Sequence, residues 1–218
     1  MHDSYVPAPW SLTGSGVVVA FLLNKAFKQQ CYPDTHGRLA FMMFVDYHTS
    51  PVGPYREWLF IPGKVDNPRG RHFSIAQIYV DSLQSVVGGQ KNWGIPKDEA
   101  EFEFRFNGPE WHLTCQKESA HLALDGDVKG PSIPINSSFM PFSLYQQRDN
   151  QHYWSTPTAT GRANWLRIKK LRFQGATFPD LSRQTCLGAL AISRFNMVFP
   201  TPDTMPVYAQ RRLGGGTE

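Results

Sequence analysis

The sequence predicts an α+β domain made mainly of antiparallel strands, with only a few short helices. Three observations support this fold class. The 218 residues include 18 glycines and 17 prolines, so the chain turns more often than a helical bundle requires. The apolar segments are short and are bounded by turns, and the clearest periodicity is the two-residue alternation of a strand. Aromatic residues make up 13% and charged residues only 18%, a composition that argues against extended disorder.

The N-terminal part of the chain consists of apolar segments separated by turn sequences. Residues 1–10, with Pro7 and Pro9, predict an extended arm. Residues 17–23 are β-branched at their start and follow a glycine-rich turn, which indicates a buried strand, with a helix as the alternative. Further strands are expected at 39–47, 55–61 and 73–80.

One short helix is expected directly after the fourth strand. Asp81 is a candidate N-cap, and Gln84 stands three residues later, in the register of a capping box. Gly88 and Gly89 predict the end of this helix after about two turns.

The segment from Glu99 to Gln116 predicts a hairpin. Ala100 and three phenylalanines alternate with charged residues up to Arg105, and a second alternation begins at Trp111. The turn Asn107-Gly108-Pro109-Glu110 joins the two halves, so we expect two antiparallel strands.

The rest of the chain continues the same pattern. Strands are expected at 163–173 and 187–199, separated by a turn at 179–183. Residues 209–218 are rich in glycine and are expected to form a flexible tail. Because there is no repeat, linker or block of charge, residues 1–218 are expected to form a single domain.

Charge, hydropathy and cysteine spacing exclude several classes of partner. The net charge is only +4, and the basic residues are densest along one expected strand at 167–172. We therefore expect no nucleic-acid partner. The longest apolar run, at 17–23, is far shorter than the ~20 residues that span a bilayer, so we expect neither a membrane segment nor a secretion signal. The three cysteines form no CxxC pair and are expected to be free thiols in the cytoplasm.

Searches for metal and cofactor motifs give nothing. The seven histidines show no HxH, HxxxH or HExxH spacing. The sequence contains neither a GxGxxG fingerprint nor a GxSxG elbow. Gly89 and Gly94 have the spacing of a phosphate loop, but Ile95-Pro96 follows where that motif needs Lys and Ser or Thr. We therefore expect no metal and no cofactor.

Two segments resemble the acetoacetate decarboxylase family. The first is Val52-Gly53-Pro54-Tyr55-Arg56-Glu57, which matches a G-x-Y-x-E strand start. The second, about forty residues later, is Val87-Gly88-Gly89-Gln90-Lys91-Asn92-Trp93-Gly94-Ile95-Pro96-Lys97, which ends in glycine, an aliphatic residue, proline and the family's Schiff-base lysine. The resemblance implies a cone-shaped β-barrel with a few short helices, assembled as a homo-oligomer.

The resemblance assigns catalytic roles to Lys97 and Glu57. A neutral Lys97 amine would attack a small keto acid or ketone, and the resulting iminium would stabilise a carbanion on the adjacent carbon. Glu57 would orient the amine or move protons. A free lysine has a pKa near 10.4, so roughly one in 2,500 is neutral at pH 7, and the family lowers this pKa by desolvation or by a neighbouring cation. Tyr55, His48 and Trp93 are candidate substrate-binding residues, with turn or core positions as their alternatives.

The sequence departs from the decarboxylase pattern at three charges. Asp98 follows Lys97 where the decarboxylase has a second lysine, and a carboxylate close to the amine would raise its pKa. The decarboxylase also has an N-terminal arginine and a glutamate earlier in its sequence. Here no arginine precedes Arg38, and no glutamate precedes Glu57. These losses disfavour acetoacetate as substrate and agree better with relatives that catalyse aldol condensation or dehydration.

The residues alone leave alternatives open. Strand parity groups Lys97 with Glu99 and Glu101, which predicts a surface lysine unless Pro96 breaks the register. Glu57 shares a face with apolar residues and is either a pocket carboxylate or part of an ion pair with Arg56 or Arg38. A Schiff-base enzyme is the favoured function. The alternatives are a non-catalytic protein that binds an apolar small molecule in the same barrel, and a scaffold whose strands self-associate.

Overall fold

The computed structural model describes residues 5–139 and 142–207. These residues are mostly strand, with two α-helices, α1 (Lys25–Cys31) and α2 (Leu83–Trp93), and one short 3-10 helix, η1 (Ser137–Phe139). The strands are β1 (Trp10–Leu22), β2 (Thr35–His36), β3 (Leu39–Thr49), β4 (Tyr55–Ile61), β5 (Lys64–Asn67), β6 (Gly70–Phe73), β7 (Gln77–Val80), β8 (Lys97–Glu99), β9 (Glu101–Asn107), β10 (Glu110–Lys117), β11 (Ala120–Asn136), β12 (Leu144–Arg148), β13 (Gln151–Ser155), β14 (Thr158–Gln174), β15 (Thr185–Phe199) and β16 (Asp203–Pro206).

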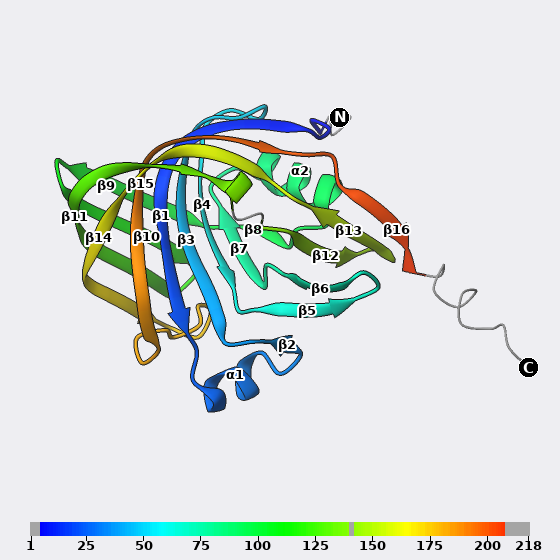
Figure 1. Cartoon of the computed structure of the whole chain (residues 1–218), viewed down its shortest axis with the longest axis horizontal. Helices are drawn as coiled ribbons and strands as arrows, with labels where there is room; N and C mark the ends of the chain where they lie inside the picture. Colours follow the sequence, from blue (N-terminus) through cyan, green and yellow to red (C-terminus); the bar gives the residue numbers. More distant parts are fainter. Residues whose placement is uncertain (1–4, 140–141, 208–218) are drawn as a thin grey trace, which may run out of the picture.

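Ten strands form one strongly curved sheet in the order β8-β7-β4-β3-β1-β15-β14-β11-β10-β9 (Figure 1). Its pairs are antiparallel except β7 and β8. The two end strands, β8 and β9, are consecutive in the chain and are separated only by Ala100. The sheet therefore curls into a nearly closed barrel, which confirms the predicted fold class. A second sheet has the order β16-β13-β12-β6-β5-β2 and lies beside α2 (Figure 1).

The central strands of the large sheet are buried on both faces. On β4, Trp58 and Phe60 pack into one apolar core with residues of β10 and β11, whereas Tyr55, Leu59 and Ile61 pack into a second apolar cluster with residues of α2. Side chains alternate along a strand, so each face supplies its own core. Burying one such side chain contributes about 1.5–3 kcal/mol. The second cluster surrounds the candidate site.

Helix α2 begins and ends at residues other than those predicted. Its N-cap is Ser82, whose Oγ accepts a hydrogen bond from the Ser85 backbone N–H at 3.3 Å, and its C-cap is Gly94, with φ of 64°. The Asp81 carboxylate instead accepts from the Arg56 backbone N–H at 2.6 Å. Because Gly94 adopts the left-handed conformation that glycine tolerates, the helix ends there and not at Gly88.

The paired glycines lie inside α2 because neighbouring side chains occupy the space of a Cβ. A Cβ at Gly88 would lie 2.5 Å from the Trp10 ring. A Cβ at Gly89 would lie 2.6 Å from Cδ of Lys97. The two glycines therefore serve close packing, and the prediction that they terminate the helix is wrong.

Most other expected elements are present. The hairpin is confirmed as β9 and β10, and the segments at 163–173 and 187–199 lie within the longer strands β14 and β15. The strand expected at 73–80 is divided between β6 and β7, and α1 was not expected. In the N-terminal arm, residues 5–9 have no regular secondary structure, and the Asn92 side chain bonds to the Val6 carbonyl and the Ala8 N–H. The expected tail at 209–218 lies outside the described residues.

The three cysteines are unpaired, with Cys115 buried and Cys31 and Cys186 exposed. In the described parts of the chain, neither helix has the length and hydrophobicity needed to cross a membrane.

Candidate functional site

Lys97 is the first residue of β8, and its side chain is only 6% exposed. Its aliphatic stem passes over Gly89 of α2, where the missing Cβ leaves room for it. The alternation of β9 does not continue back to Lys97, because β8 and β9 belong to opposite ends of the sheet and the chain changes partner at Ala100. The parity argument for a surface lysine is therefore wrong.

The Lys97 ammonium group has three hydrogen-bond partners. Its Nζ lies 2.7 Å from Glu57 Oε2, 3.0 Å from Ser85 Oγ and, in a longer contact, 3.5 Å from the Tyr55 hydroxyl. The other carboxylate oxygen of Glu57, Oε1, accepts a hydrogen bond from the Tyr47 hydroxyl at 3.0 Å. All three protons of the ammonium group thus face an acceptor, and both carboxylate oxygens of Glu57 are occupied.

These contacts decide the charge of the pair. Burial lowers the pKa of Lys97. Glu57 and Tyr55 together raise it by more than burial lowers it, so the pKa lies above its ordinary value. Burial, and secondarily Glu57, hold the pKa of Tyr47 well above its ordinary value. In the resting protein Lys97 and Glu57 are therefore a buried ammonium–carboxylate pair, and burial does not by itself supply the neutral amine that Schiff-base chemistry needs.

Asp98 does not act on the Lys97 amine. Its carboxylate is 61% exposed and lies 2.8 Å from Lys117 Nζ, and the hydrogen bond from Lys117 lowers the pKa of Asp98. Adjacent residues of a strand point to opposite faces, so Asp98 and Lys97 diverge. The carboxylate that raises the Lys97 pKa is Glu57.

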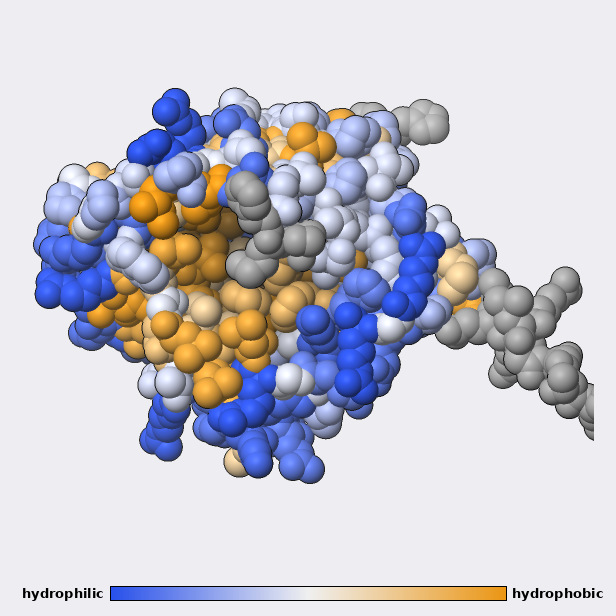
Figure 2. Space-filling model, viewed as in Figure 1, coloured by the Kyte–Doolittle hydropathy of each residue, from blue (hydrophilic) through white to orange (hydrophobic). Residues whose placement is uncertain are grey.

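Lys97 and Glu57 line a cavity of about 340 Å³ that is otherwise mostly apolar. Its walls come from β1, β3, β4, β15, α2 and the segment around η1. Figure 2 shows apolar side chains gathered around a hollow on this face of the molecule. The apolar lining includes Trp10, Leu12, Met43, Val45, Leu59, Ile61, Ile75, Ile78, Trp93, Ile95, Ile135, Phe142, Leu144, Ile192, Phe195, Met197 and Phe199.

The structure brings together four of the five residues singled out from the sequence. Tyr55 and Trp93 line the cavity with Lys97 and Glu57. Trp93 forms part of the wall: its Nε1 donates to the Pro200 carbonyl at 2.7 Å, and its ring packs edge-on against Trp10 at 5.1 Å.

The placement of His48 in the pocket is wrong. Its side chain is 56% exposed, it contacts Ser15 Oγ at 3.3 Å, and it does not line the cavity. Along β3 the inward position belongs to the preceding residue, Tyr47, because side chains alternate.

Sequence reasoning missed three residues of the site: Tyr47, Ser85 and Gly89. Tyr47 pairs directly with Tyr55 between β3 and β4, so the register of that hairpin identifies it. Ser85 and Gly89 are four residues apart on the buried face of α2, a spacing that places them on one side of a helix. Both signals depend on boundaries of strands and helices that a single sequence gives poorly.

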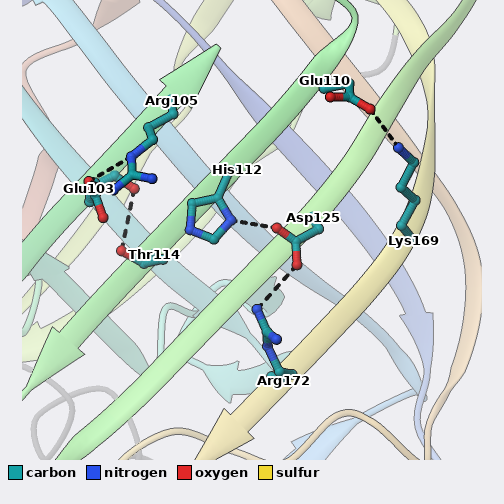
Figure 3. Close-up of polar contacts among 8 residues, drawn as sticks. All are labelled: Glu103, Arg105, Glu110, His112, Thr114, Asp125, Lys169 and Arg172. Carbon is teal, nitrogen blue, oxygen red and sulfur yellow. Dashed lines mark hydrogen bonds and ion pairs between the residues drawn. The ribbon is translucent and has the colours of Figure 1, made fainter. Parts of the chain in front are cut away.

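Other polar clusters are of a different kind. On the outer face of the barrel, Glu110 pairs with Lys169 at 2.9 Å and Asp125 pairs with Arg172 at 3.2 Å and with His112 (Figure 3). These side chains are partly exposed, and such pairs contribute about 0–1 kcal/mol each. Among the described residues, no three His, Cys, Asp or Glu side chains gather in a way that would hold a metal ion.

Comparison with known proteins finds likeness in three dimensions only. No protein-family model matches the sequence, and no curated protein matches it. Acetoacetate decarboxylase from Legionella pneumophila subsp. pneumophila superposes with a TM-score of 0.71 at 14% identity, over 94% of this chain and 90% of that chain. A second acetoacetate decarboxylase structure gives 0.73 at 11% identity, over 93% and 91%. The enduracididine biosynthesis enzyme MppR complexed with pyruvate gives 0.65 at 11% identity, over 93% and 92%. The chain therefore has the fold of these enzymes.

Proposed function

We propose that this protein is an acetoacetate decarboxylase-like enzyme in which Lys97 forms a Schiff base with a small keto acid or ketone. One observation carries the proposal: a lysine amine that is almost wholly buried lies in an apolar cavity, 2.7 Å from a carboxylate. The shared fold supports it, since the structural neighbours are enzymes and one of them is complexed with pyruvate. Perturbed titratable groups in a cavity are typical of catalytic sites.

Glu57 offers a route to the neutral amine. When a carbonyl compound enters, Glu57 takes a proton from the Lys97 ammonium, and the free amine attacks the carbonyl carbon. The N–C bond forms, the oxygen takes one proton from the attacking nitrogen and one back from Glu57, and water leaves as the C–O bond breaks. The products are an iminium at Lys97, a carboxylate at Glu57 and one water. The pair begins and ends with one positive and one negative charge, so with an uncharged ketone the apolar cavity never holds a lone charge.

The iminium then accepts electrons from the neighbouring bond. It stabilises a carbanion left by departure of carbon dioxide, by aldol cleavage or by removal of a proton before dehydration. Tyr55 and Ser85 hold the nitrogen, and Tyr47 holds the carboxylate. The apolar walls exclude water, which strengthens each of these electrostatic contacts.

Borohydride trapping tests this proposal. The protein is incubated with ketones and with 2- and 3-keto acids, reduced, digested and mapped by mass spectrometry. We expect an adduct on the peptide that contains Lys97, retained in the surface control Lys25→Met and lost in Lys97→Met. Failure of every carbonyl compound to label Lys97 would contradict the mechanism.

A second candidate function is supported by the raised pKa of Lys97. A permanently charged Lys97–Glu57 pair would be structural, and the apolar cavity would then hold a small molecule without chemistry. Native mass spectrometry of the purified protein distinguishes the two. A retained apolar ligand in a protein that never forms a borohydride adduct favours binding alone.

We further propose that the chain assembles as a homo-oligomer. Trp165 and Leu187, on adjacent strands of the outer face, are 59% and 55% exposed, and exposed apolar side chains that lie together mark protein–protein contact surfaces. Light scattering measures the mass, and a monomer at micromolar concentration would contradict this expectation.

A further inference from the structure

We infer that the carbonyl compound taken up at Lys97 is uncharged and carries an apolar chain, for example a medium-chain methyl ketone, and that keto acids, and with them the decarboxylation route, are disfavoured. This inference rests on the proposed function and specifies its substrate class. Three properties of the cavity carry it: its charge balance, the position of its polar groups and its volume.

The charges of the cavity are already balanced. Of the described residues that line it, only Lys97 and Glu57 are charged, and they neutralise each other at 2.7 Å. A substrate carboxylate would be a third charge without a partner, and after iminium formation the cavity would hold a net negative charge. Burying an unpaired carboxylate is costly because the apolar walls cannot replace its hydration.

Two arginines on elements that border the site are engaged elsewhere. Arg56 of β4 lies near the carboxylates of Asp46 and Asp81, and Arg148 of β12 bonds to Gln90 and lies near Asp149. Neither arginine lines the cavity. A bidentate clamp for a substrate carboxylate is thus absent from the described lining.

The polar groups of the cavity are concentrated around the amine. Lys97, Glu57, Tyr47 and Tyr55 form one connected network. The hydroxyl of Ser137, which also lines the cavity, already accepts a hydrogen bond from the Ala159 N–H at 2.7 Å. The remaining lining is aliphatic, aromatic or thioether. A ligand that fits this distribution has its carbonyl at Lys97 and hydrocarbon elsewhere.

The volume exceeds what a short keto acid fills. A water-sized group takes about 30 Å³, so a cavity of about 340 Å³ accommodates on the order of ten non-hydrogen atoms. Acetone and acetoacetate are smaller than this, whereas 2-octanone is close to it. Each added CH₂ that enters the cavity is worth about 0.8 kcal/mol, or about a fourfold gain in affinity.

The test compares three carbonyl compounds with the full-length protein. Acetone, 2-octanone and 2-oxooctanoate are each titrated in the borohydride assay, and the concentration that half-saturates the Lys97 adduct is measured. We expect 2-octanone to act at a concentration at least ~100-fold below acetone, which corresponds to burial of about three to four of its five additional CH₂ groups. We also expect it to act at least tenfold below 2-oxooctanoate, whose chain is of the same length but carries a carboxylate.

Two further outcomes separate this inference from the proposed function. If 2-oxooctanoate labels Lys97 at an equal or lower concentration, the charge argument fails while Schiff-base chemistry stands. If no compound labels Lys97, the proposed function fails. Calorimetry with 2-octanol and octanoate, which cannot form an adduct, then tests the cavity alone. Tighter binding of 2-octanol supports its neutral, apolar character, and equal or tighter binding of octanoate overturns it.

Discussion

Replacing Glu57 by glutamine isolates the interaction that sets the charge of Lys97. The side chains of Glu57 and Lys97 are 4% and 6% exposed. The Glu57→Gln substitution keeps the shape of the side chain while removing its charge. Lys97 then retains the burial that lowers its pKa and loses the strongest influence that raises it. Removing one partner of a buried pair costs about 3–5 kcal/mol, because the other charge is left uncompensated. We expect the free energy of unfolding at neutral pH to fall by about this amount.

The substitution should reverse the direction in which Lys97 makes the free energy of unfolding depend on pH. In the parent protein the folded-state pKa of Lys97 is raised, so its stabilising contribution is complete below about pH 10.4 and is lost as the pH rises through the folded-state pKa. In Glu57→Gln we expect burial, the largest single influence on this group, to lower the folded-state pKa. The unfolded chain then binds more protons, and stability rises with pH up to about pH 10.4. The difference between the two proteins should therefore shrink between about pH 7 and pH 10, by up to 1.4 kcal/mol per pH unit.

Urea unfolding followed by tryptophan fluorescence measures both effects. Glu110→Gln is the matched control, since it removes a carboxylate from an exposed pair with Lys169 and should cost about 0–1 kcal/mol without changing the pH slope (Figure 3). A Glu57→Gln variant as stable as this control, or one whose destabilisation is constant across the pH range, would refute the buried pair as we describe it.

Three further predictions concern the surroundings of Lys97. Gly89→Ala should lower the free energy of unfolding by about 1–3 kcal/mol, because the new Cβ displaces the side-chain stem of Lys97. The displacement should also slow trapping at Lys97 on the order of 100-fold. A stabilised variant, as expected for alanine in an unobstructed helix, would contradict this. Tyr47→Phe removes a hydrogen bond to the Glu57 carboxylate and should cost about 1.5–3 kcal/mol in urea unfolding; no loss would show that the bond is weak. Asp98→Asn should leave the yield of the Lys97 adduct unchanged in the trapping assay, and a marked change would mean that Asp98 reaches the amine.

The fold follows from the sequence where the local pattern agrees with the tertiary structure. The alternation of Phe102 and Phe104 with charged residues identifies β9, because one face of that strand is solvated. Gly88 and Gly89 mislead, because their role is set by Trp10 and Lys97, which approach from distant parts of the chain. From the local sequence, a pair of glycines predicts the end of a helix. The residues that pack against the pair cannot be identified from that sequence, because they are distant in the chain.

The candidate site could be predicted only where the local strand pattern agrees with the tertiary structure. Glu57 shares strand parity with Tyr55 and Leu59, and the structure places all three at the cavity. Parity failed for Lys97, because a single residue, Ala100, carries the chain from one end of the sheet to the other. The raised pKa of Lys97 lay beyond sequence reasoning, since it depends on a 2.7 Å contact between residues 40 positions apart.

A crystal structure of the protein after reduction with 2-octanone and borohydride would show whether Lys97 forms the Schiff base inside the apolar cavity. We expect continuous density from Lys97 Nζ into the apolar cavity, with the Glu57 carboxylate still within hydrogen-bond distance of that nitrogen. Density for the ligand on a surface lysine, or an unmodified Lys97 still paired with Glu57 in a protein that carries the adduct elsewhere, would contradict it.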